Sequence, residues 1–255
     1  MTPEPDLPRW GIVLLTWRIL IENSGAALRN AVLPFLILLA MHRLTGIVAP
    51  AGFHLIGWQM LHVAVFPIPA ALLLVPWYRR ILSAQRPELA NRPARWWYVA
   101  FMIRTLLLEL MLFASQIPSM VASVMAVESG GAPDPELARL ALMFFLVALA
   151  PGFYLYGRAG LSLPAAACGD DDGYVRSWRM SGGAGWRIAG IVIVVWFPFF
   201  IISGMVSGVP AEGTAPAPPA FLDAAMSAAI DVVRELAMAA ALGLVYLHYS
   251  APRGN

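Results

Sequence analysis

Five ionisable residues lie well inside two segments that are apolar enough to cross a membrane. Arg104 and Glu109 fall in residues 96–124, and Asp231, Arg234 and Glu235 fall in residues 221–246. An unpaired charge at the centre of a bilayer costs about 2.5–3.5 kcal/mol. Depth in the membrane can be counted at about 1.5 Å per residue from the end of each segment that lies on the arginine-rich side. This puts Arg104 and Glu235 at one depth, and Glu109 and Asp231 at another. We therefore expect the two segments to pack together through an intramembrane polar core.

Two interpretations fit this polar core. Three acids and two bases can pair almost completely, so the charges can simply fasten two helices together. Ionisable residues within a membrane also mark proton paths, ion paths and sites for charged substrates. The residue types and their spacing leave both interpretations open.

Two histidines and one serine are the other residues that could carry chemistry. His42 and His62 fall in neighbouring apolar segments, but neither has a cysteine or an acid beside it, so we expect no haem, no metal and no other cofactor. Ser162 has only His248 at a suitable depth. The metalloprotease, serine-hydrolase and phosphate-loop motifs are missing, so the sequence predicts a protein that is not an enzyme.

Composition points to a membrane protein. Of 255 residues, 60% are apolar and only 13% are charged, and the mean hydropathy is +0.71. A soluble domain carries about 25% charged residues, so most of this surface does not face water. We predict an all-α polytopic membrane helix bundle, forming one transmembrane domain over 1–255. About six apolar runs approach the length that a bilayer requires; they cover residues 28–47, 56–78, 96–124, 137–156, 186–206 and 221–246.

Two further segments are predicted as short interfacial helices. Residues 10–23 repeat apolar side chains at helical spacing, which is typical of a helix lying in the headgroup region; the alternative is that they form the first turns of the first span. Residues 170–183 begin with acids and end with glycines, the pattern of a capped short helix. The span 56–78 is expected to leave the membrane at Trp77 and Tyr78.

The distribution of arginine predicts the orientation. Seventeen residues are basic and all are arginine; thirteen of them fall on one side of the predicted spans, whereas Arg139 alone lies near a span end on the other. The basic side is expected to be cytoplasmic, with both termini inside. The composition favours a multi-pass protein of a bacterial inner membrane. Arginine beside tryptophan suits anionic headgroups rather than nucleic acid; the predicted lipid anchors are Arg79, Arg80, Arg95, Trp96, Trp97, Trp186 and Arg187.

One stretch resembles a known signature. Arg158-x-x-Leu-Ser-Leu-Pro164 is followed by acidic residues, by Ser177-Trp178-Arg-Met-Ser-Gly182 and by Trp186-Arg187-Ile188. This pattern is similar to that of poorly characterised bacterial polytopic membrane proteins, including YciC-like proteins and the membrane domain joined to some glycerophosphodiester phosphodiesterases. The resemblance implies a six-helix membrane bundle with a partner or regulatory role. It brings no catalytic residues, and no phosphodiesterase domain is present in this sequence.

These observations favour a non-enzymatic membrane protein. The first expectation is a lipid-contacting accessory or scaffold subunit of an inner-membrane complex, so that lipid and a second membrane protein are the expected partners. The alternative is a small transporter or channel that uses the buried charges. Its support is that each of the first five spans contains at least one proline, since transporters use broken helices at binding sites; these residues include Pro34, Pro67, Pro118, Pro151 and Pro198.

Overall fold

The computed structural model describes residues 9–48, 53–85, 96–128, 135–169, 173–207 and 220–250, and every regular element within them is an α-helix. The helices are α1 (Arg9–Glu22), α2 (Ser24–Val48), α3 (Phe53–Val65), α4 (Pro67–Gln85), α5 (Trp97–Glu128), α6 (Pro135–Gly160), α7 (Ser162–Ala167), α8 (Gly173–Met180), α9 (Gly185–Ser207) and α10 (Phe221–Ser250). The predicted all-α bundle is confirmed.

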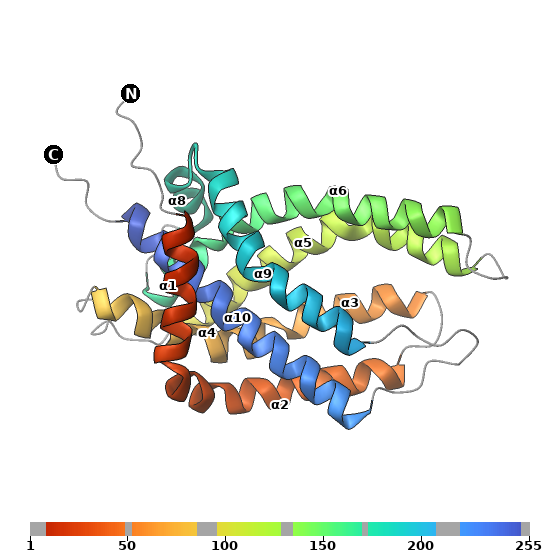
Figure 1. The fold of residues 1–255 in the computed structure, drawn as a ribbon, viewed down its shortest axis with the longest axis horizontal. Coiled ribbons are helices and arrows are strands. Elements are labelled where there is room, and N and C mark those ends of the chain that lie inside the picture. Colours follow the sequence, from red (N-terminus) through yellow and green to blue (C-terminus); the bar gives the residue numbers. More distant parts are fainter. Residues whose placement is uncertain are drawn as a thin grey trace.

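Five segments of the described chain are long and apolar enough to cross a membrane. They are Ser24–Leu44, Gln59–Ala84, Trp97–Val121, Leu142–Ala167 and Gly185–Val206, and they support the prediction of a multi-pass membrane protein. Helix α10 runs alongside them (Figure 1). Its acidic residues and Arg234 lower its hydropathy, so a sixth span stays a prediction.

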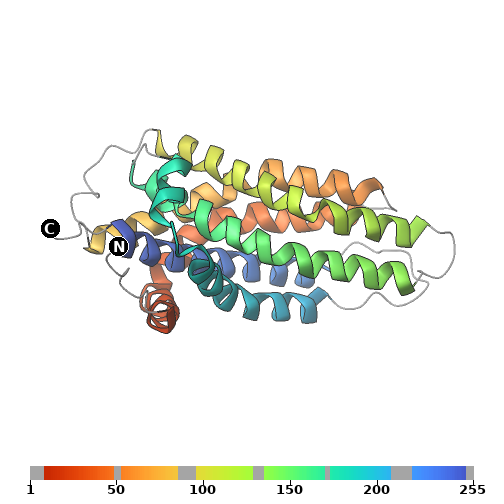
Figure 2. The ribbon, with the colours of Figure 1, turned by 90° about the horizontal axis from the view of Figure 1, so that it is seen from above.

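Helix α10 lies at the centre of the packing. It contacts α1, α2, α4 and α9, and its second half, from Leu236 to Leu247, is buried throughout. Helices α5 and α6 form a hairpin on the other side of the bundle (Figures 1 and 2), and α9 packs against both α6 and α10. The α5–α6 hairpin therefore joins the rest of the bundle through α9, against α6, and through α4, against α5.

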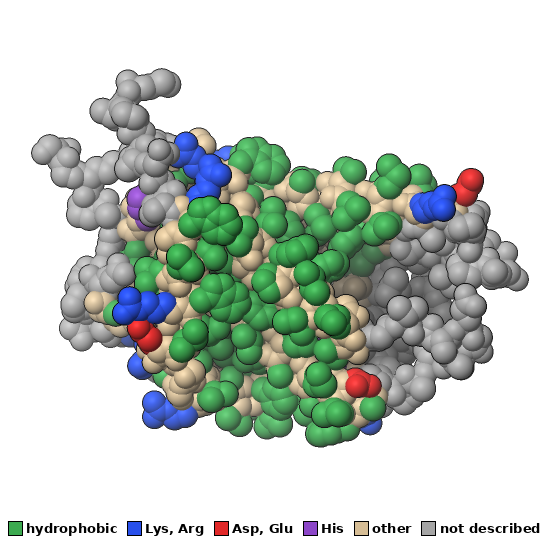
Figure 3. Space-filling view, viewed as in Figure 1, with side chains coloured by type: hydrophobic (Ala, Val, Ile, Leu, Met, Phe, Trp, Pro, Cys, Tyr) green, Lys and Arg blue, Asp and Glu red, His purple; other side chains and the backbone are tan. Residues whose placement is uncertain are grey.

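The outer surface has the pattern expected of a protein in a bilayer. Figure 3 shows apolar side chains across the middle of the visible face, with basic and acidic groups at its two ends. Large apolar side chains such as Leu36, Val147 and Phe197 are half exposed or more. A water-facing surface would bury these groups, whereas acyl chains solvate them.

Helices α3 and α4 together make one span with a break at Phe66. Pro67 lacks a backbone N–H and begins the second helix. The predicted exit at Trp77 and Tyr78 is wrong, because both side chains are fully buried and α4 continues to Gln85. The Nε1 of Trp77 donates a hydrogen bond of 3.0 Å to the carbonyl of Leu236. These aromatic residues hold α4 against α10.

Residues 10–23 form a helix that is distinct from the first span. A turn at Asn23 separates α1 from α2, and α1 runs across the long axis of the bundle, so that it is seen end-on in Figure 2. Ile12 and Val13 are buried against the bundle, whereas Trp10 and Leu14 are about 70% exposed. Such a two-sided helix suits the headgroup region.

Candidate functional site

An ion network links α2 to α10. Asp231 accepts from Arg234 Nη1 at 2.8 Å through Oδ1, and its Oδ2 lies 2.8 Å from Nε2 of His42. Arg234 also reaches Glu235, with its Nη2 3.1 Å from Oε1. Arg234 and Glu235 follow Asp231 by three and four residues, which places both of them one helical turn after Asp231 on the same face of α10. Asp231 and Arg234 are thus satisfied within the protein.

Glu109 faces this network across a cavity. The cavity has a volume of about 280 Å³ and is bounded by α5, α6, α9 and α10; its polar lining residues are Glu109, Gln116, Tyr156, Arg234 and Glu235. The carboxylate of Glu109 makes no hydrogen bond or ion pair with any described residue. It is therefore the acidic group that a ligand or a proton would meet.

A second cavity continues the first toward α3. It has a volume of about 320 Å³, and Gln59 and His62 line its far side. The two cavities share the side chains of Glu109, Leu112, Gln116 and Phe145. Figure 3 shows the surface hollowed between α6 and α9, away from the end where α1 lies. Glu109 thus lines both cavities.

The predicted pairing of Arg104 with Glu235 is wrong. Arg104 instead donates from Nη1 to the carbonyl of Ser162 at 2.7 Å, and no ion pair joins Arg104 to Glu235 within the described chain. The spans holding these residues are not packed neighbours, because α5 contacts α3, α4, α6 and α7, whereas α10 contacts α2, α4 and α9. The structure therefore brings Glu109, Asp231, Arg234 and Glu235 to one region and leaves Arg104 outside it.

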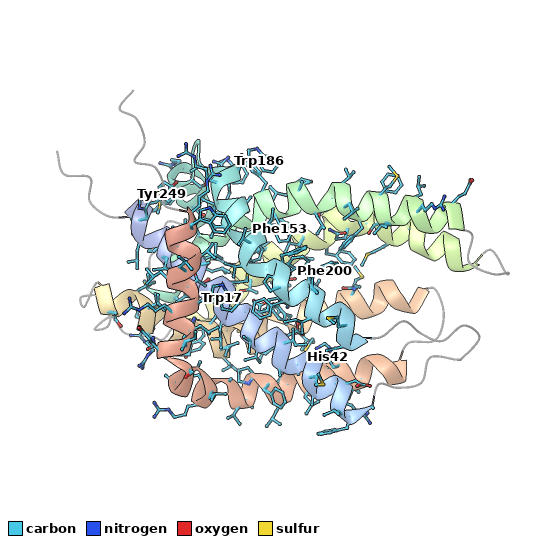
Figure 4. The ribbon with its side chains drawn as sticks, in the orientation of Figure 1. Trp17, His42, Phe153, Trp186, Phe200 and Tyr249 are labelled. Atoms are coloured by element: carbon cyan, nitrogen blue, oxygen red, sulfur yellow. The ribbon has the colours of Figure 1, made fainter. Side chains whose placement is uncertain are left out.

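His42 is the member of the network that the sequence interpretation did not connect. Its side chain projects from α2 toward α10 (Figure 4) and meets Asp231. Counting depth along the span 28–47, as was done for the other two segments, would have placed it near Asp231. His62 is stacked on Phe66 at a centroid distance of 5.2 Å and lines the second cavity together with Glu109. The described residues hold no group of three His, Cys, Asp or Glu side chains arranged for a metal ion.

The signature around Arg158 forms a cluster of hydrogen bonds and ring contacts. Arg158 donates to Ser181 Oγ at 3.0 Å, to Tyr154 Oη at 3.0 Å and to the carbonyl of Trp178 at 2.5 Å. Its guanidinium also lies over the Trp178 ring, 3.8 Å from the centroid. Ser177 Oγ donates in return to the carbonyl of Arg158. One arginine thus fastens α8 to the end of α6.

Gly185 and Tyr174 belong to the same stretch and add two further contacts to this cluster. A Cβ on Gly185 would lie 2.5 Å from Tyr154 Cε2, so only glycine allows α9 to begin so close to α6. Tyr174 Oη donates to the carbonyl of Arg104. Burial raises the pKa of Tyr174 to about 12, which keeps its hydroxyl a donor at neutral pH. The signature residues described here join α6, α8 and α9 to one another.

The predicted lipid anchors divide into two groups. Trp96 is 75% exposed and Trp186 is 64% exposed, so their anchor role stays a prediction. Trp97 is 7% exposed and packs against Gly169, with the guanidinium of Arg79 4.3 Å from its ring centroid. The anchor role predicted for Trp97 is therefore wrong.

The remaining predicted anchors differ in what surrounds them. Arg80 Nε donates to Asn23 Oδ1 at 2.8 Å, which ties α4 to the turn after α1. Arg187 follows Trp186 in the first turn of α9. Arg95 lies outside the described residues.

The neighbouring tryptophans of α5 give a direct test of this division. Trp97→Ala should lower the free energy of unfolding by about 3–5 kcal/mol, because it empties a filled site. Trp96→Ala removes the same side chain from an exposed position and should change it by less than about 1 kcal/mol. Denaturant titration in detergent micelles measures both. Equal losses would contradict the assignment.

Comparison with protein-family models, with curated proteins and with solved structures gave no match to this chain. The resemblance to YciC-like proteins and to the membrane domain of glycerophosphodiester phosphodiesterases stays a prediction. Function must be argued from the cavity and its charges.

Proposed function

We propose that this chain is a small membrane transporter whose solute binds in the cavity between α5, α6, α9 and α10. The observation that supports the proposal is Glu109, a carboxylate deep in a membrane bundle with no partner among the described residues. Such a group is costly to keep ionised in the membrane. A role in binding accounts for its presence, whereas a purely structural charge would be paired as Asp231 is.

Three of the helices around the cavity contain internal prolines, which favour bending. Pro118, Pro151 and Pro198 lie inside α5, α6 and α9, which supply three of its four walls. An internal proline removes a backbone hydrogen bond and bends a helix. Bent helices around a site at mid-membrane allow the site to open toward one side and then the other. The proposal places the Arg-rich end in the cytoplasm of a bacterium and involves no enzymatic step.

Transport should depend on the charge at Glu109. Proteoliposomes on a solid-supported membrane, challenged with panels of charged and zwitterionic solutes, should give transient currents with one solute class. Glu109→Gln should abolish these currents, because the site loses its charge while the protein keeps its unfolding temperature. Glu136→Gln makes the same change at an exposed position of α6 and should leave the currents intact. Undiminished currents with folded Glu109→Gln protein would refute the proposal.

A second candidate function is a lipid-contacting accessory subunit of an inner-membrane complex. The exposed apolar side chains on α1, beside an Arg-rich end of the bundle, favour it. Native mass spectrometry of the protein released gently from its membrane distinguishes the two functions. A second polypeptide at fixed stoichiometry supports the accessory role, and a lone chain or homo-oligomer carrying only lipid argues against it.

A further inference from the structure

The cavity has two chemically different walls. Aromatic side chains of α6 and α9 form one of them: Phe153 meets Trp196 edge to face, with centroids 5.1 Å apart, and Trp196 stacks on Phe200 at 4.9 Å. Phe200 in turn stacks on Phe145 at 6.5 Å. Figure 4 shows Phe153 and Phe200 in the region where α6 and α9 approach each other. Phe145, Phe153 and Trp196 line the cavity directly.

The helices α5 and α10 supply the charged part of the lining, where carboxylates outnumber bases among the described residues. Arg234 is engaged by two carboxylates, those of Asp231 and Glu235, at 2.8 and 3.1 Å. Glu109 then adds a third acid on α5, and Arg234 is the only base among the described residues that line this cavity; His62 lines the adjoining cavity, which Glu109 also borders. Asp231, Glu235 and Glu109 thus carry three carboxylates, whereas Arg234 carries the one guanidinium beside them. Negative charge remains in excess even when His42 pairs with Asp231. A bound cation would remove that excess.

We infer that the solute is an amphipathic organic cation, such as an aryl- or alkylammonium, with its charge near Glu109 and its apolar body against Trp196 and Phe153. The inference rests on the proposed transport function and names its substrate class. Aromatic faces and a carboxylate both attract an ammonium group. An anion would meet repulsion from the acids, and a neutral solute would leave Glu109 unpaired.

The composition of the cavity argues against an inorganic ion. Calcium and magnesium require several oxygen ligands at short distance. The lining residues are mainly Leu, Phe, Trp, Met and Gly, and no suitable group of three ligands occurs in the described ranges. A largely apolar cavity with a few convergent polar groups is typical of sites for organic molecules. The second cavity, which shares Glu109 and Phe145, supplies space for a longer apolar body.

The test uses three probes of one shape and different charge. Benzyltrimethylammonium is the cation, neopentylbenzene is its neutral carbon isostere and benzylsulfonate is an anion of similar outline. The full chain is placed in nanodiscs of uncharged phosphatidylcholine, and binding is followed by calorimetry, with empty nanodiscs subtracted. The wild-type protein should bind the cation saturably, with one site per chain, and should bind neither other probe saturably.

Two variants locate the site. Glu109→Gln should weaken cation binding by roughly tenfold or more, and Trp196→Leu by several-fold, because each removes one attraction for the ammonium group. Glu109→Asp keeps the charge and should retain binding, which controls for damage to the fold. Glu136→Gln serves as the exposed control. Equal binding of benzylsulfonate and the cation, or unchanged cation binding by folded Glu109→Gln protein, would overturn the inference.

Failure of the inference can be told apart from failure of the transport proposal. Saturable, Glu109-dependent binding of the cation without any current supports the ligand class and refutes transport. Glu109-dependent currents with another solute, in protein that does not bind benzyltrimethylammonium, support transport and refute the ligand class.

Discussion

Replacing Arg234 by Met should lower the free energy of unfolding by about 3–5 kcal/mol, the range for breaking a buried ion pair by removal of one partner. Arg234 lies between Asp231 and Glu235, so its loss leaves two carboxylates facing each other inside the bundle. The remaining bond from His42 can compensate only Asp231. Denaturant titration in micelles measures the change.

Two variants show whether the loss comes from unpaired charge. The triple variant D231N/R234M/E235Q removes the whole charged set and should recover most of the stability, since replacing a buried ionic group as a unit is often nearly neutral. Arg29→Met makes the same substitution at an exposed position of α2 and should change the stability by less than about 0.5 kcal/mol. A triple variant as unstable as Arg234→Met would show that packing, and not charge, sets the effect.

Gly169→Ala should be destabilising by about 2–4 kcal/mol through backbone strain and overpacking together. Gly169 has a φ of +71°, a conformation that side chains disfavour. A Cβ there would lie 2.5 Å from Nε1 and 2.8 Å from Cε2 of Trp97. The substitution forces the loop after α7 away from the start of α5. Thermal unfolding in detergent should show the loss as a lowered midpoint.

Gly190 provides the matched control. It lies inside α9, and a Cβ there would meet no atom within 4 Å. Gly190→Ala should be neutral or stabilising by up to about 1 kcal/mol, the difference in helix propensity. Trp97→Phe removes the indole atoms that clash, so it should partly rescue Gly169→Ala. Equal losses for Gly169→Ala and Gly190→Ala would contradict the close contact with Trp97.

The helices were predictable because their cause is local. Long apolar runs bounded by aromatic and basic residues can satisfy their backbone in a bilayer only as helices, and the observed bounds of α5 and α9 lie within a few residues of the expected ones. The helix α8 was also predicted from local signals, and the turn that follows it contains Gly183, whose φ is +75°. The same local signals did not decide whether residues 10–23 continue into the first span, and it is the turn at Asn23 that separates α1 from α2.

The order of the helices around the bundle was not predictable in this way. Depth along the membrane can be counted from the sequence, but the direction in which a side chain points around the helix axis depends on the neighbours. Arg104 and Glu235 have similar depth on helices that are not in direct packing contact. His42 and Asp231 have both the depth and the direction, and they meet. Trp97 shows the same limit, because its headgroup-like sequence context does not reveal Gly169 beside it.

The charges of α10 also bear on how the protein is made. A segment that carries Asp231, Arg234 and Glu235 partitions poorly into lipid by itself, because each such residue opposes insertion. Its partner His42 belongs to α2, which is synthesised long before it. If α10 is the predicted sixth span, its entry into the bilayer would require an assembled bundle that already offers His42 and the faces of α4 and α9. The polar face of α10 would then make its insertion depend on the earlier helices.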